Sequence, residues 1–319
     1  MRQEYCRFIQ DRTLSTQNQG ELSGSSVNIG ALLGLLTALL WSIAVIFFKK
    51  SGEHVHPIAL NLFKDVLAFT LFIPTSMVVG QALMYDAPMH DWIVLAISGV
   101  MGICLADTLF FYSLQLLGAS LSAIINCLYS PAIVFFSIWI LDERLTMMQG
   151  MGIGAIVLAV ALATGSKRSE HLSTRQIVLG LLAGVGAVTT SGIGIVLMKP
   201  VLEHSPVIWV SEVRLLFGIL GLMLVLLFNP HRRAIINSLR VKEGQKFTLL
   251  GSFFGAYLCL LPWAAGFKYG QASTTSALQQ VSYLLVFVFA LIFLKEKFSY
   301  WKVSGIVIGM VGIYMVTFG

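Results

Sequence analysis

Five ionisable side chains lie inside long apolar stretches of this sequence, where a charge is costly to bury in lipid and is therefore a candidate for function. They are Lys64, Asp65, Asp107, Glu212 and Arg214. Asp107 has no basic residue within one helical turn and would lie near the middle of a bilayer. We expect it to attract a cationic group of a solute or to carry a coupled proton.

The other four charges form two pairs, Lys64 with Asp65 and Glu212 with Arg214. Each pair holds both signs within two residues. Neighbours so close in sequence point to different faces of a helix, so each charge needs a partner on another helix or at an interface. We predict intramembrane charge pairing for all four, with direct contact to a substrate as the alternative.

Two stripes of polar side chains recur at helical spacing in two distant apolar stretches. The first contains Ser122, Asn126, Tyr129 and Ser130, and the second contains Thr275, Gln279, Ser282 and Tyr283. Their spacing places each set on one face of a helix. Lipid cannot satisfy amides and hydroxyls, so these faces should border the protein interior or a wet cavity. We predict that Asn126, Tyr129, Ser130, Gln279 and Tyr283 line a substrate cavity with Asp107, and that Trp41 and Thr190 add to it.

The motifs of an intramembrane enzyme are absent from the sequence. It has no His-Glu-x-x-His, no Gly-x-Ser-Gly, no Gly-x-Gly-Asp and no Walker A sequence. His54 and His56 form a lone His-x-His with no evident third ligand for a metal. We therefore expect no enzyme activity, no catalytic residues, no metal site and no cofactor.

Composition identifies the elements that must position these residues. The 319 residues are 57% hydrophobic and only 11% charged, with a net charge of +6, whereas soluble domains are about a quarter charged. Ten apolar runs between Ile29 and Phe318 have the length of membrane crossings. Basic residues lie mostly between the runs, as topology determinants rather than a nucleic-acid surface. The sequence predicts an all-α integral membrane protein with ten transmembrane helices.

An internal repeat organises these helices. A shift of 153 residues places Leu141–Leu145 on Leu294–Phe298 and Asn126 on Gln279, and a shift of 150 places Lys64 on Arg214. Five helices per copy is an odd number, so the second copy must enter the bilayer in the opposite sense. Inverted-topology repeats are typical of secondary transporters. We predict a flexible polar tail over 1–28, one repeat over 29–165, a linker over 166–176 and a second repeat over 177–319.

From Gly30 to Phe318 the chain resembles the drug/metabolite transporter superfamily, in particular its ten-helix type with two EamA-like repeats. The resemblance rests on Lys64 and Arg214 in the second helix of each half, on Gly102-x-x-x-x-Asp107 followed by Gly118-Ala-Ser, and on Pro131. It rests also on the Leu-x-Glu element at Glu143 and Glu296. The resemblance implies a carrier of small metabolites, often amino acids, through a central cavity, and a structural role for Glu143 and Glu296. It also implies cytoplasmic termini, although the Lys and Arg count favours the opposite orientation.

We therefore expect an integral, multi-pass secondary transporter of the plasma or inner membrane, which exports small polar metabolites by alternating access. Its partners would be a small-molecule substrate and the lipid bilayer, with proton coupling as an option and no nucleic acid. Gly-xxx-Gly pairs such as Gly305/Gly309 predict close packing of helices within the chain or in a homo-oligomer. One alternative is a nucleotide-sugar or phosphorylated-metabolite carrier with Lys268, Lys64 and Arg214 in a basic cavity. The other is a non-transporting scaffold or sensor that binds a partner through Pro230–Lys246.

Overall fold

Helices account for all the regular secondary structure in the described part of the chain. The computed structural model describes residues 29–30, 32–80, 85–129, 131–132, 135–136, 146–165, 172–269, 272–296 and 298–318. The predicted tail over 1–28 lies outside these residues. The helices are Leu32–Ser51, α2 (Pro57–Val79), α3 (Met89–Gly99), η1 (Val100–Ala106), α4 (Asp107–Leu117), α5 (Ala119–Asn126), α7 (Met147–Gly165), α8 (Thr174–His204), α9 (Val207–Leu227), α10 (Arg232–Asn237), η2 (Ser238–Arg240), α11 (Lys242–Ser252), η3 (Phe253–Leu258), α12 (Leu260–Tyr269), α13 (Ala272–Phe293) and α14 (Tyr300–Phe318).

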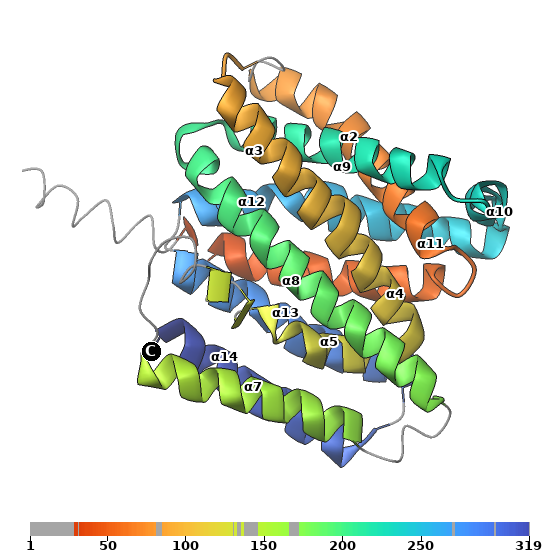
Figure 1. Ribbon diagram of the computed structural model, residues 1–319, viewed down its shortest axis with the longest axis vertical. Helices are drawn as coiled ribbons and strands as arrows, with labels where there is room; N and C mark the ends of the chain where they lie inside the picture. Colours follow the sequence, from red (N-terminus) through yellow and green to blue (C-terminus); the bar gives the residue numbers. More distant parts are fainter. Residues whose placement is uncertain are drawn as a thin grey trace, which may run out of the picture.

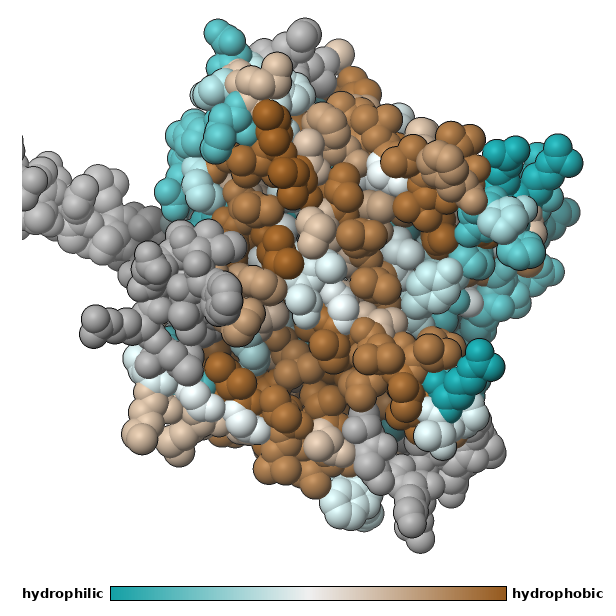
Figure 2. Space-filling view, viewed as in Figure 1, coloured by the Kyte–Doolittle hydropathy of each residue, from teal (hydrophilic) through white to brown (hydrophobic). Residues whose placement is uncertain are grey.

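Seven of the described helices are long and apolar enough to cross a membrane. Two more, Met147–Ala163 and Leu278–Phe293, are apolar but shorter. Hydrophobic side chains form a broad band across the middle of the face shown in Figure 2, and hydrophilic side chains gather at two opposite edges. This distribution suits a bundle that lies across a bilayer, with its polar ends in the two aqueous phases. The chain is an all-helical, multi-pass membrane protein.

The fourth apolar run does not form one continuous helix. The sequence predicts a helix over Ala119–Leu141, but α5 ends at Asn126 and a turn follows at residues 127–128. Pro131 explains this break, because a proline inside a helix clashes with the carbonyl group four residues earlier, here that of Cys127. The turn lies immediately after Asn126 and separates this residue from Tyr129, the next described member of the polar stripe.

Corresponding helices of the two predicted repeats pack on each other. α2 lies against α9, α5 against α13, and α7 against α14, which run side by side at the lower edge of Figure 1. α8 packs on η1 and α4, and the helix Leu32–Ser51 packs on the counterpart of that segment in the other half. There a Cβ on Gly255 would lie 2.7 Å from the Ala44 Cβ. The first helix of each half thus contacts the third segment of the other half.

The third helix of each half is interrupted by one π-helical segment, and the two segments lie at matching positions. η1 begins at Val100 and η3 begins at Phe253, which are separated by the 153 residues of the sequence repeat. Each segment contributes residues to the centre of the bundle, among them Gly102 in η1 and Gly255 in η3. π-Helical turns are rare and occur frequently at functional sites, because they leave backbone groups without their usual helical partners. Neither segment is signalled by the apolar pattern, which is continuous through both.

Candidate functional site

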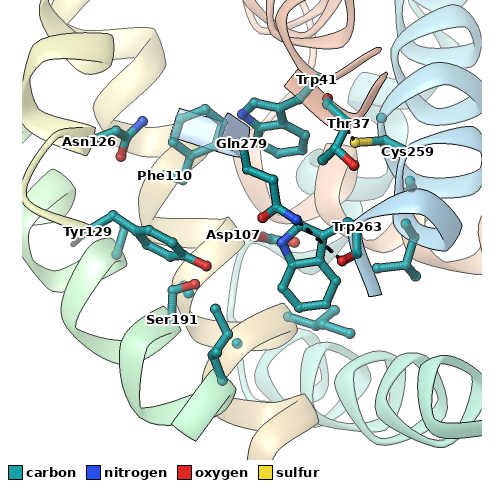
Figure 3. Close-up of a pocket in the computed structure, with 18 of the residues that line it drawn as sticks. Thr37, Trp41, Asp107, Phe110, Asn126, Tyr129, Ser191, Cys259, Trp263 and Gln279 are labelled. Carbon is teal, nitrogen blue, oxygen red and sulfur yellow. Dashed lines mark hydrogen bonds between the residues drawn. The ribbon is translucent and has the colours of Figure 1, made fainter. Parts of the chain in front are cut away.

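A central cavity of about 200 Å³ lies between the two halves of the bundle. Its walls come from the first helix, α2, η1, α4, α8, α9, η3, α12 and α13, with Asn126 at the end of α5 and Tyr129 beyond it. Figure 3 shows polar and aromatic side chains from several of these elements facing one space. A single water needs only about 10–15 Å³ of such space, so the cavity can hold several water molecules. The cavity is therefore of a size for a small solute.

Most of the predicted cavity residues line this space. Trp41, Asp107, Asn126, Tyr129, Gln279 and Tyr283 all do. Thr190 does not, because its hydroxyl donates to the Gly186 carbonyl at 2.8 Å within α8, and the next residue, Ser191, faces the cavity instead. Ser130 lies outside the described residues. Sequence reasoning therefore found the helices that form the walls more reliably than the individual positions on α8.

Lys64 is the electrostatic centre of one wall. Its Nζ lies 2.5 Å from Oδ1 of Asp65 and 2.8 Å from Oδ2 of Asp107. The side chains of Lys64 and Asp65 are 6% and 0% exposed, whereas that of Asp107 is 29% exposed. Lys64 thus contacts both its sequence neighbour Asp65 and Asp107 on another helix, and Asp107 finds on α2 the base that its own helix lacks. Because one cation faces two carboxylates, this group carries a net negative charge when all three are ionised.

Glu212 and Arg214 have different surroundings. The two residues lie on different faces of α9, and they form no ion pair with each other or with any other residue that the structure describes. Glu212 lies away from the cavity and interacts with Ser76. Arg214 lines the cavity. A separation of two residues on a helix turns side chains apart by roughly 200°, which accounts for the difference.

Backbone contacts hold the cavity walls in register. Nδ2 of Asn61 on α2 donates to the Ile103 carbonyl in η1 at 2.8 Å, and Ser98 donates to the Gly194 carbonyl on α8 at 2.6 Å. Nε2 of Gln279 donates to the Trp263 carbonyl at 3.3 Å (Figure 3). Asn61 was not identified from the sequence. Asn61 could have been identified because its amide side chain lies within an apolar stretch, three residues before Lys64.

Aromatic side chains form the apolar part of the cavity. The rings of Trp41 and Phe110 lie 5.7 Å apart, and Trp263 faces them across the cavity. The Tyr129 hydroxyl points toward Ser191 (Figure 3). The cavity thus combines flat apolar surfaces with a few polar groups, as small-molecule sites usually do. Thr37, Phe110 and Ser191 complete it without having been proposed as main site residues.

The residues that line the cavity fall largely into pairs related by the sequence repeat. A shift of 150 residues joins Trp41 to Ser191, Lys64 to Arg214 and Asp65 to Leu215, and all six line the cavity. A shift of 153 residues does the same for a second group of pairs. These are Gly102 with Gly255, Asp107 with Leu260, Phe110 with Trp263 and Asn126 with Gln279.

Two further predicted residues lie away from the cavity. Lys268 is not part of its lining, and its Nζ donates to the Ser205 carbonyl at 2.5 Å. The Glu296 carboxylate accepts hydrogen bonds from the backbone N–H groups of Ala119 at 2.7 Å and Ser120 at 3.2 Å. It therefore caps α5 from the opposite half. Glu143 lies outside the described residues. The basic cavity of the alternative hypothesis loses Lys268, and its Lys64 is neutralised.

An all-helical membrane bundle around a central polar cavity is the architecture of a transporter, and comparison with known proteins agrees. The model of the EamA-like transporter family matches residues 28–165 and 178–318. The chain belongs to the EamA-like transporter family, within the drug/metabolite transporter superfamily. It is a membrane transporter of that family.

Individual relatives are distant. An uncharacterized transporter of Archaeoglobus fulgidus is 22% identical over 288 residues, which cover 89% of this chain and 96% of the relative. The WAT1-related protein At5g47470 of Arabidopsis thaliana is 25% identical over 237 residues, covering 67% of this chain and 64% of the relative. A crystal structure with 18% identity superposes with a TM-score of 0.66 over 91% of this chain and 96% of its own. That likeness concerns the fold alone.

Proposed function

We propose that the protein is a secondary transporter that exports small polar metabolites, amino acids or related solutes, by alternating access around the central cavity. The observation that carries this proposal is the pairwise lining of the cavity by residues at matching positions of the two halves. A cavity shared by two related halves can open to either side of the membrane when the halves rock against each other. The family assignment supports transport, and the paired lining supports the central cavity as the solute site in this proposal.

The proposal includes ten transmembrane helices in two five-helix repeats of opposite orientation, over 29–165 and 177–319. The packing of α2 on α9, α5 on α13 and α7 on α14 supports it, because helices close to a two-fold axis contact their own counterparts. The contacts between the first helix of each half and the third of the other half, and the matching positions of η1 and η3, support it independently.

Within the cavity we assign the polar groups to solute binding. Asn126, Tyr129, Gln279 and Tyr283 would hydrogen-bond the solute. Asp107 would receive its cationic group or carry the coupled proton, because it is the most exposed member of the Lys64 group and its Oδ1 is not engaged by Lys64. The same cavity is small for a nucleotide sugar, since sites for larger ligands span about 300–1,000 Å³.

The direct test is counterflow in liposomes that contain the purified protein. Radiolabelled amino acids, amines, nucleotide sugars and phosphorylated metabolites would be compared, with and without an imposed pH gradient. We expect saturable exchange of a small polar solute. Asp107→Asn should abolish pH-gradient-driven uptake but spare exchange, whereas Glu212→Gln, which alters a buried acid outside the cavity, should leave both intact. Folded protein that exchanges no solute would contradict the proposal and favour a scaffold role.

A further inference from the structure

Arg214 is the one basic side chain in the described cavity wall that has no carboxylate partner within the described residues. It is 5% exposed, and its Nε has no hydrogen-bond partner there. Nη1 lies 2.9 Å from the Met198 sulfur, a weak acceptor, and the guanidinium lies over the Trp263 ring at 5.5 Å. These contacts hold the group in place. Asp107 acts on it only across the cavity, because no described carboxylate lies within ion-pair distance of the guanidinium.

Close backbone packing brings the guanidinium to the cavity. Gly102 in η1 lies directly beside it, and a Cβ at that position would be 2.8 Å from Nη2 of Arg214. At Gly99, one turn earlier, an added Cβ would collide with the Arg214 backbone. The two glycines therefore let η1 approach α9 closely enough for the Arg214 side chain to reach the cavity. Figure 3 shows its ring partner, Trp263, among the residues around this space.

The sequence repeat shows what Arg214 lacks. Its counterpart Lys64 is neutralised by Asp65 and Asp107 at 2.5 and 2.8 Å. The positions equivalent to these acids are Leu215 and Leu260, and both line the cavity. One half thus supplies a base with two carboxylates, and the other supplies a base with two leucines.

We propose that the carboxylate of the transported solute is the missing counter-ion, and that Arg214 is the residue that binds it. This inference rests on the proposed transport function and adds the chemical class of the substrate, a small carboxylate. Guanidinium and carboxylate form two parallel charge-assisted hydrogen bonds, and a buried site makes this pairing selective against neutral analogues. A cationic group on the same solute would then face the net negative Lys64 group.

The charge balance favours a carboxylate over a phosphate. The ionised side chains in the described lining are Lys64, Arg214, Asp65 and Asp107, two of each sign. A phosphate ester carries nearly two negative charges at neutral pH. It would meet a single uncompensated cation and the two acids of the opposite wall. A carboxylate adds one negative charge and meets one unpaired guanidinium. If the solute also carries a cationic group, the occupied cavity stays neutral.

The experiment compares carboxylates with their uncharged amides on purified protein in lipid nanodiscs. The probes are the common L-amino acids and short aliphatic carboxylates, each beside its carboxamide, with thermal stabilisation and titration calorimetry as binding readouts. The variants are Arg214→Lys, which keeps the positive charge without the guanidinium fork, and Arg214→Met, which removes the charge and the donors but leaves an unbranched side chain. Lys268→Gln removes a base that lies outside the cavity and serves as the control. Liposome counterflow of the same probes is measured in parallel.

We expect at least one carboxylate, and not its amide, to bind the wild-type protein and the Lys268→Gln variant. Affinity should fall about 10- to 100-fold in Arg214→Lys and further in Arg214→Met, as expected for loss of a bidentate charged contact. Binding of that kind without flux would refute the transport function and leave the assignment of Arg214 intact. Flux of amines, amides or sugars, without flux or binding of any carboxylate, would support the transport function and refute the assignment of Arg214. Unchanged carboxylate affinity in a folded Arg214→Met protein, or no carboxylate binding at all, would overturn the assignment.

Discussion

Replacing Lys64 with Met should strongly destabilise the fold, and the structure gives the size of the effect. Met keeps most of the length of the side chain but removes the cation that lies 2.5 Å from Asp65. The Asp65 side chain is 0% exposed, and its Oδ2 has no other partner among the described residues. Removing one member of a buried ion pair costs about 3–5 kcal/mol, because the other charge stays buried without compensation.

A second substitution should recover most of this loss. The counterpart of Asp65 in the other half is Leu215, which lines the same cavity, so a leucine suits this kind of position. Lys64→Met/Asp65→Leu should therefore lie within about 1 kcal/mol of the wild type, since an apolar pair can replace a buried ion pair at little cost. Asp65→Leu alone leaves Lys64 paired with Asp107 at 2.8 Å and should cost about 1–3 kcal/mol.

These values define a double-mutant cycle with a coupling free energy of about 4–8 kcal/mol. Reversible unfolding in mixed detergent micelles, followed by tryptophan fluorescence, would give the free energy of unfolding of each variant. Lys64→Arg is the control that retains the charge. If the two single substitutions instead add in the double variant, Lys64 and Asp65 are not an electrostatic unit, and our account of this wall is wrong.

Three further predictions concern the framework around the cavity. Glu296→Ala should lower the free energy of unfolding by about 1–2 kcal/mol, because α5 loses its carboxylate cap; an unchanged value in detergent unfolding would contradict the cap. Gly312→Ala should destabilise by about 1–3 kcal/mol, since its Cβ would lie 2.6 Å from Ile156, while Gly154→Ala, with open space around it, should be neutral in the same assay. Burial lowers the pKa of His56, whose neutral ring accepts a hydrogen bond from Ile58 N at 3.3 Å. Stability should therefore decline as pH falls below about 6.5, where the unfolded chain takes up the proton first, and His56→Asn should flatten that dependence.

Features with a local signal were predictable from the sequence. Most helices appear near their apolar runs, and the polar stripe containing Asn126 and Gln279 borders a cavity as its spacing indicated. The side-chain period of a helix is enough to identify such a face, because lipid leaves polar groups no other partner. Pro131 contributes to the family resemblance, but the sequence analysis does not predict the turn at residues 127–128 that precedes it.

Features that depend on contacts between helices were not predictable. The sequence places Asp107 without a base because Lys64 is 43 positions away, and only the packing of α2 on α4 joins them. Likewise, Glu212 and Arg214 are neighbours in sequence but face different surroundings. The π-helical turns of η1 and η3 leave no trace in the hydrophobic pattern, since they alter hydrogen bonding without altering composition.

The two halves share a framework but differ in the charged side chains that they supply to the cavity, and this difference favours one orientation of a bound solute. Both supply a base from the second helix, a glycine in the π-helix and an aromatic ring in the third helix. Only the first half supplies acids to its base. A symmetric cavity would bind a solute in two equivalent orientations, whereas an acidic wall opposite an unpaired guanidinium favours one. In the transport cycle that we propose, rocking of the two halves would expose the site to each side in turn, and the unequal charges would keep the solute in a single orientation.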